Sequence, residues 1–177
     1  EPYHTITAYL EQAAGFARKK GLQFHLDGAR IYNAAVKLGV DVTAITRHFD
    51  TVSCCLSKGL GAPVGSVLAG PEAQIKAARR WRKMLGGGMR QAGILAAAGI
   101  HALTYHVDRL AEDHENAAML ASELNALDQV VIDVAAVHTN ILFAAIDADM
   151  EQLAGFLKEK GILIATTNPV RLVTHLD

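Results

Sequence analysis

Segments with strand-like and helix-like patterns alternate along the first half of the chain, and this order constrains the fold more than any other feature. Apolar residues recur at helical spacing over 5–20 and 31–38, whereas 22–26 alternates and 51–56 is rich in β-branched and apolar residues. This order predicts an α/β domain with a mostly parallel sheet, in which ligands bind at the carboxyl ends of the strands. We therefore expect functional residues where predicted strands end.

Further elements follow along the chain. Before the glycine run 86–88 we expect a helical turn, a strand and a helix, and after it a buried apolar helix and a long amphipathic one: 43–48, 65–69, 72–82, 91–105 and 107–127. Past residue 128 the pattern predicts a small α+β unit, with a helix at 150–160 and strands at 130–134, 141–145, 161–165 and 170–174. We predict two domains, 1–107 and 108–177.

The composition excludes several classes of protein. Apolar residues make up 51% of the chain and charged residues 20%, which is typical of a globular domain, and the net charge of −1 favours neither nucleic acid nor anionic membrane. No apolar run is long enough for a transmembrane helix. Cys54 and Cys55 are adjacent, so a mutual disulfide is not expected, and two cysteines without a framework predict a cytoplasmic protein.

Two polar motifs stand where predicted strands end. The first is Leu26–Arg30 (LDGAR) and the second is Ser57–Gly61 (SKGLG). Because parallel strands end at the same edge of a sheet, we expect Asp27 and Lys58 to converge there. A Schiff-base cofactor with a pyridine ring needs this pair, since a lysine amine forms the imine and a carboxylate keeps the ring nitrogen protonated.

The same residues also have simpler explanations. Asp-Gly after a strand is usually a turn, and a lysine before glycine is usually exposed. The six basic residues within 76–90 are more typical of a solvated helix face than of an anion site or a nucleic-acid site, since Trp81 is the one aromatic residue among them. His101 and His106 are five residues apart and should not share a helix face, so no metal site is predicted.

Several motifs, in the same order along the chain, resemble the low-specificity L-threonine aldolases. They are LDGAR at 26–30, CLSKGLGAPVGS at 55–66, WRKM at 81–84 with GGGMRQ at 86–91, EDH at 112–114 with Asn116, and VRLVTH at 170–175. The likeness extends over essentially the whole chain.

The resemblance implies a fold-type-I enzyme dependent on pyridoxal 5′-phosphate (PLP). Its large PLP-binding domain, partly present here, would have a mostly parallel sheet, and its small carboxyl-terminal domain would be α+β. The implied reaction cleaves L-threonine and L-allo-threonine to glycine and acetaldehyde. The implied assembly is a homotetramer, a dimer of dimers that shares active sites, without nucleic-acid or membrane partners.

The resemblance also implies roles for individual residues. Lys58 matches the lysine that forms the Schiff base with PLP, and Asp27 matches the partner of the pyridine nitrogen. Arg30 matches a position near the cofactor O3′ and the substrate, and Arg171 matches the clamp for the substrate α-carboxylate, which a planar guanidinium binds bidentately. The alternatives are that Arg30 caps its helix or pairs with Asp27, and that Arg171 is an exposed strand residue.

Two more basic residues concern the cofactor phosphate. Lys83 and Arg90 match positions that reach the phosphate from a neighbouring subunit. The family's phosphate-binding loop and stacking residue correspond to sequence before Glu1, and the chain begins without Met. We therefore expect a fragment lacking the amino-terminal part, which by itself binds PLP weakly and has little aldolase activity.

Two other functions remain open from the sequence. Another fold-type-I PLP enzyme, such as a β-eliminating lyase acting on cysteine- or tyrosine-like substrates, would release a keto acid and ammonia in place of an aldehyde. A non-catalytic scaffold would retain oligomer contacts alone, and replacing Lys58 by alanine would then abolish nothing.

Overall fold

The computed structural model describes residues 2–176, which divide into two compact units. The first unit runs to Arg109, and the second runs from Leu110 to Leu176. The division predicted from the sequence lies two residues earlier, after residue 107. The residues proposed to bind PLP lie in the first unit, and Arg171 lies in the second.

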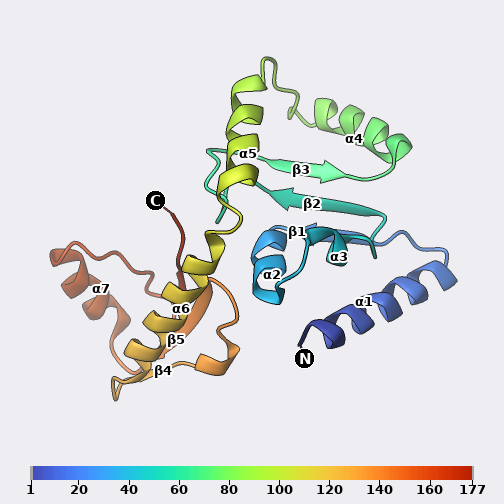
Figure 1. Cartoon of the computed structure of the whole chain (residues 1–177). Coiled ribbons are helices and arrows are strands. Elements are labelled where there is room, and N and C mark those ends of the chain that lie inside the picture. The colour runs from blue at the N-terminus through green and yellow to red at the C-terminus, as the bar shows by residue number, and fades with distance from the viewer. Residues whose placement is uncertain (1, 177) are drawn as a thin grey trace. The chain divides into compact units, whose positions relative to one another are not determined.

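The first unit consists of helices around a three-stranded sheet. Its elements are α1 (Pro2–Lys19), β1 (His25–Gly28), α2 (Ile31–Leu38), α3 (Val42–Thr46), β2 (Thr51–Cys55), β3 (Ser66–Ala69), α4 (Glu72–Met84) and α5 (Gly93–Tyr105). The strands lie in the order β1-β2-β3 (Figure 1). β1 is parallel to β2, and β3 is antiparallel to β2.

The prediction of a mostly parallel sheet is therefore wrong for β3. The segment 56–65 between β2 and β3 contains no helix. Parallel neighbours need a crossover of about a dozen residues or more, usually helical, so the shorter connection returns the chain antiparallel. The parallel pair β1-β2, joined through α2 and α3, is the part of the sheet that follows the predicted pattern.

β1 and β2 approach each other closely at the last residue of β1. Gly28 stands opposite Cys54, and a Cβ atom added to Gly28 would lie 2.6 Å from the backbone oxygen of Ser53. A side chain at position 28 would push the two strands apart. The glycine of LDGAR therefore permits the close pairing of β1, which contains Asp27, with β2, which precedes Lys58.

The core of the first unit lies around α2. Ile31 and Ala35 are one helical turn apart on the same face and are buried with Ile45 of α3. Partly buried residues from α1, β1 and β2, namely Leu10, Leu26 and Cys54, pack against them. α2 ends at Gly39, whose φ of 66° gives the left-handed conformation that glycine adopts most easily.

The predicted buried helix 91–105 corresponds to α5, but it is not buried. Gly99 and Ala102 are its buried residues, whereas Ile94 is 82% exposed and Ile100 66% exposed. An apolar sequence shows that a helix is stabilised by burial, but it does not show which element covers it. Within the described chain, α5 is covered mainly on its Gly99 side. α5 is 13 residues long, and among residues 2–176 no helix has the length and apolarity to cross a membrane.

The second unit packs a helix on an antiparallel sheet. Its elements are α6 (Leu110–Asn125), β4 (Val130–Val131), the 3-10 turn η1 (Val134–Ala136), β5 (Ile141–Ile146), α7 (Met150–Glu159) and β6 (Val170–Val173). The strand order is β4-β5-β6, with both pairings antiparallel (Figure 1). The strand predicted at 161–165 is not formed: this segment pairs with none of the three strands, and Leu163 is 80% exposed.

The core of the second unit lies between α6 and β5. Ala117 and Ala121 of α6 are fully buried, and their small side chains let the helix approach Leu142 and Ala144 of β5 closely. Val130 completes this face of the sheet. The second unit thus has a core of its own, separate from that around α2.

Candidate functional site

Asp27 and Lys58 lie near the carboxyl ends of two paired parallel strands. Asp27 is the third residue of β1 and stands opposite Ser53, while Lys58 comes just after the end of β2. The Asp27 Oδ1 accepts a hydrogen bond of 3.2 Å from the Ala29 N–H, and the side chain is exposed. Asp27 therefore forms the turn that the simpler explanation predicts, and its carboxylate stays accessible at this edge.

Lys58 begins a tight turn within the segment 56–65, which we call the Lys58 loop. The Gly61 N–H donates to the Lys58 carbonyl at 2.8 Å, and Gly61 has a φ of 71°. The Ala62 N–H donates to the carbonyl of Leu56 at 2.9 Å. Lys58 is half-buried, so its side chain is confined on one side and reachable on the other.

Arg30 and Lys58 line the same small cavity. The cavity is also lined by Tyr32, Cys55 and Gly59, and its volume is about 10 Å³, close to that of a single water molecule. Arg30 is the residue before α2, but a guanidinium has no acceptor, so its side chain cannot serve as an N-terminal cap. The structure thus brings together two of the predicted residues, Arg30 and Lys58, beside the strand that contains Asp27.

Lys83 and Arg90 lie elsewhere in the first unit. Lys83 is in the last turn of α4, and Arg90 is in the segment between α4 and α5; both are exposed. A Cβ atom added to Gly88 would lie 2.7 Å from Lys83 Cδ, so the lysine side chain runs across this glycine. Neither residue lines the cavity that contains Lys58.

Arg171 lies on β6 of the second unit, opposite Phe143, and its side chain is exposed. Two asparagine side chains hold the ends of this strand. Asn168 donates to the Ile146 carbonyl at 2.7 Å and accepts from the Ile146 N–H at 3.0 Å. At the other end, Asn140 Nδ2 donates to the Thr174 carbonyl at 2.9 Å.

The sequence does not single out these asparagines. Asn140 is fully buried, whereas Asn168 is exposed. Asn140 directly precedes the predicted strand 141–145, and Asn168 stands two residues before the predicted strand 170–174. A polar residue next to a strand end is the one signal that could have identified them. Their effect is to fix the backbone on either side of Arg171.

His101 and His106 are closer than their spacing predicts. Their ring centroids are 5.2 Å apart in an edge-on arrangement. α5 ends at Tyr105, and His106 caps the helix in a right-handed conformation with its N–H bonded to the Ala102 carbonyl. The two rings therefore meet at the end of the helix, and the prediction that they lie apart is wrong. Within residues 2–176 no group of three or more potential ligand side chains is placed to hold a metal ion.

His106 is also a site residue that sequence reasoning missed. Its Nδ1 lies 2.6 Å from the carbonyl oxygen of Leu60, in the middle of the Lys58 loop. The two residues are 46 positions apart, and no spacing pattern connects them.

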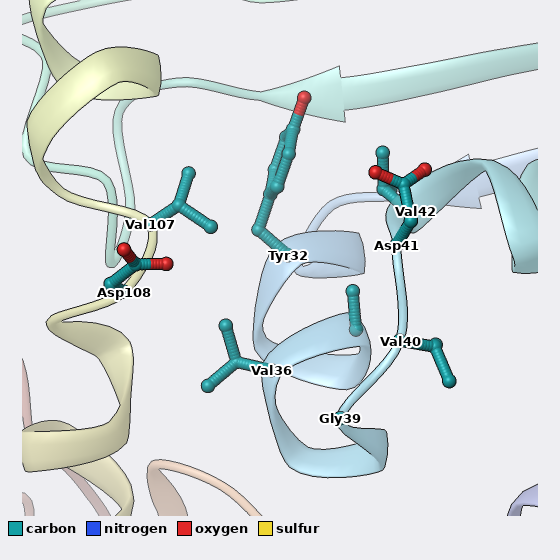
Figure 2. A pocket seen from close by; sticks show the side chains of 9 residues that line it. Tyr32, Val36, Gly39, Val40, Asp41, Val42, Val107 and Asp108 are labelled. Atoms are coloured by element: carbon teal, nitrogen blue, oxygen red, sulfur yellow. The ribbon is translucent and has the colours of Figure 1, made fainter.

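A larger cavity of about 410 Å³ is lined by residues of α2, of the segment 39–42 that follows it, and by Val107 and Asp108 (Figure 2). Figure 2 shows Tyr32 between Val107 and the pair Asp41 and Val42. Burial raises the pKa of the Tyr32 phenol, and Cys54 and Asp41 raise it further. Tyr32 also lines the cavity with Arg30 and Lys58, so this residue is common to both cavities.

Comparison with curated proteins identifies close relatives. The chain is 50% identical over 170 residues to the low specificity L-threonine aldolase of Escherichia coli, covering 96% of this chain and 50% of that protein. It is 46% identical to the probable low-specificity L-threonine aldolase 2 of Arabidopsis thaliana, covering 94% of this chain and 49% of that protein. The chain spans about half the length of the curated relatives it matches.

Solved structures and a family model agree with these relatives. An aromatic amino acid beta-eliminating lyase/threonine aldolase from Exiguobacterium matches with a TM-score of 0.81 at 24% identity, over 95% of this chain and 52% of that one. An L-allo-threonine aldolase structure from Listeria monocytogenes matches with a TM-score of 0.81 at 21% identity, over 94% and 50%. These likenesses establish an α/β fold. The family model for beta-eliminating lyases matches residues 5–149, and the chain therefore belongs to the beta-eliminating lyase family.

Proposed function

We propose that the chain takes part in a PLP-dependent aldolase reaction that cleaves L-threonine and L-allo-threonine to glycine and acetaldehyde. One observation carries the proposal: Lys58 and Arg30 lie together at a void of about 10 Å³, next to the strand that contains Asp27. The chain is also 50% identical over 170 residues to a low specificity L-threonine aldolase. The beta-eliminating lyase family uses PLP.

The chemistry of these side chains fits the groups of PLP. Lys58 would hold the aldehyde carbon through its amine, Asp27 would pair with the ring nitrogen, and Arg30 would lie near the phenolic O3′. When bound, PLP supplies an electron-accepting ring that spreads the negative charge left on the substrate α-carbon. Asp27 is suited to its role because Oδ1 is oriented by the Ala29 N–H and a carboxylate keeps a second oxygen as acceptor.

Arg171 would bind and orient the substrate. A guanidinium binds a carboxylate with two parallel hydrogen bonds, which fixes the rotation of the amino acid about its α-carbon. The anchoring of β6 by Asn168 and Asn140 supports this role, because a clamp on a fixed strand loses little conformational freedom when it binds.

We also propose a homo-oligomer, a dimer of dimers in a cytoplasmic setting. Lys83 and Arg90 are exposed and would reach the cofactor phosphate of a neighbouring subunit. The exposed apolar surface of α5, with Ile94 and Ile100, supports burial in an assembly. Cys54 and Cys55 are free thiols, which supports a reducing compartment.

The test is to identify the products formed from several amino acids. With PLP in excess, L-threonine and L-allo-threonine should give glycine and acetaldehyde, at a low rate because the chain spans about half the length of its relatives. Lys58→Ala should lower the rate by about a thousandfold or more, because the amine that holds the cofactor is lost. The matched control is Lys37→Ala, an exposed lysine on α2, which should keep the wild-type rate.

A second candidate is β-elimination, which the family description favours. Release of a keto acid and ammonia from cysteine- or tyrosine-like substrates, without aldehyde from threonine, would support it over the aldolase. If wild type and Lys58→Ala formed the same products at the same rates in every assay, a non-catalytic scaffold role would be supported over both enzyme functions.

A further inference from the structure

The carbonyl oxygen of Leu60, in the Lys58 loop, accepts none of the backbone hydrogen bonds that form the turn. The loop bonds run from the N–H of Leu56, Gly61 and Ala62 to the carbonyls of Gly65, Lys58 and Leu56. Leu60 is only 4% exposed, so its carbonyl needs a donor from elsewhere. That donor is the imidazole of His106, whose Nδ1 lies 2.6 Å from the Leu60 oxygen.

This contact defines the tautomer of His106. A carbonyl oxygen can only accept, so Nδ1 must bear the hydrogen, and Nε2 is the acceptor of the neutral ring. An imidazolium would also donate from Nδ1, so the bond does not depend on the charge of the ring.

The contact also ties the loop to a helix. The backbone N–H of His106 donates to the Ala102 carbonyl at 2.9 Å, which attaches the residue to the last turn of α5. A Cβ atom on Gly61 would lie 3.5 Å from His106 Nδ1, so the ring lies directly against the turn. A loop with glycines at 59 and 61 is flexible by composition, and the helix end limits its movement.

We propose that His106 is a positioning residue, which holds the Lys58 loop in place through the hydrogen bond from Nδ1–H to the Leu60 carbonyl. The inference rests on the proposed function, because the position of Lys58 matters only if its amine holds the cofactor. It concerns an interaction of the chain itself, so it can be measured without cofactor or substrate.

The experiment compares variants that differ in one donor. The amide nitrogen of Asn can occupy the place of His Nδ1, whereas Leu has nearly the shape of Asn without a donor. In the full chain, His106→Leu should increase hydrogen exchange of the Gly61 and Ala62 amides about tenfold, because a buried carbonyl loses its partner. His106→Asn should keep exchange near the wild-type rate.

Two further variants keep the test decisive. His106→Phe retains an aromatic ring without a donor and should behave as His106→Leu does, including where the Leu variant folds poorly. His101→Leu removes the neighbouring exposed imidazole and should leave the loop unchanged. Wild-type exchange in both donor-free variants would overturn the proposal, and so would an Asn variant as fast as the Leu variant.

A second measurement separates this inference from the proposed function. Borohydride trapping of PLP on Lys58 should slow in His106→Leu and recover in His106→Asn. If the wild-type chain forms no adduct at Lys58, the proposed function fails while the exchange data still decide the role of His106. If the adduct forms equally fast in all variants, the positioning role fails and the cofactor assignment stands.

Discussion

Neighbouring cysteines on β2 have different surroundings. Cys54 packs against the core around α2, and burial is the main cause that raises the pKa of its thiol from the ordinary 9.0. Cys55 points the other way, accepts a hydrogen bond of 3.3 Å from Ser66 Oγ, and lines the cavity with Lys58. The alternation of a strand thus puts one thiol against the core and the other at the candidate site.

The raised pKa of Cys54 predicts a loss of stability at alkaline pH. The unfolded chain ionises this thiol near pH 9.0 while the folded chain still holds the proton, so folding is favoured below 9.0 and loses that contribution as the pH rises through the folded pKa. In Cys54→Ala, the free energy of unfolding should therefore fall less steeply above pH 9 than in wild type, when each is referred to its own value at pH 7. The free energies are measured by denaturant titration at each pH. If the free energy of unfolding fell equally steeply with pH in both proteins, the prediction would be contradicted.

The position of a single functional residue could be predicted where a reactive side chain stands at the end of a predicted parallel strand. The parallel pairing of β1 with β2 was predictable, and it puts Asp27 and Lys58 near the ends of neighbouring strands. That the two side chains converge on one cofactor stays a prediction, since Asp27 does not line the cavity with Lys58. His106 could not be placed, because its contact with Leu60 depends on where α5 ends in space, and the sequence contains no periodic trace of that contact.

At the scale of elements, the close pairing of β1 and β2 makes a sharp prediction. Gly28→Ala should lower the free energy of unfolding by about 1–3 kcal/mol, because its Cβ would meet a backbone oxygen that cannot move without parting the strands. Gly15→Ala is the matched control, since nothing lies within 4 Å of a Cβ added to that helical glycine. It should stabilise α1 by about 0.5–1 kcal/mol.

Urea titrations of the two variants measure both changes. Equal effects at the two positions would contradict the clash at Gly28.

Helices with one apolar face were predicted well, and elements that depend on partners were not. The bounds of α2 are those predicted, 31–38, because its apolar stripe and Gly39 are both local signals. The segment 161–165 has strand-like composition but is paired with no strand of its unit, and Leu163 is 80% exposed. The burial of α5 likewise depends on what covers it, which its own residues do not specify.

At the scale of the whole molecule, the two cores predict separate responses to core mutations. Leu142 is 1% exposed in the core of the second unit, so Leu142→Ala should cost about 2–5 kcal/mol. Hydrogen exchange should increase in β5 and β6 and stay unchanged in α2. Phe143→Ala, at the next position on the opposite face and 54% exposed, should change exchange little. Equal acceleration in α2 after Leu142→Ala would show a single cooperative unit.

The most direct test of the account is to find which amine of the chain binds PLP. The chain is incubated with excess PLP, reduced with borohydride, digested and mapped by mass spectrometry. The account predicts a pyridoxyl group on the peptide that contains Lys58, and its loss in Lys58→Ala but not in Lys37→Ala. A label concentrated on any other lysine, or one that persists at the wild-type level in Lys58→Ala, would contradict it.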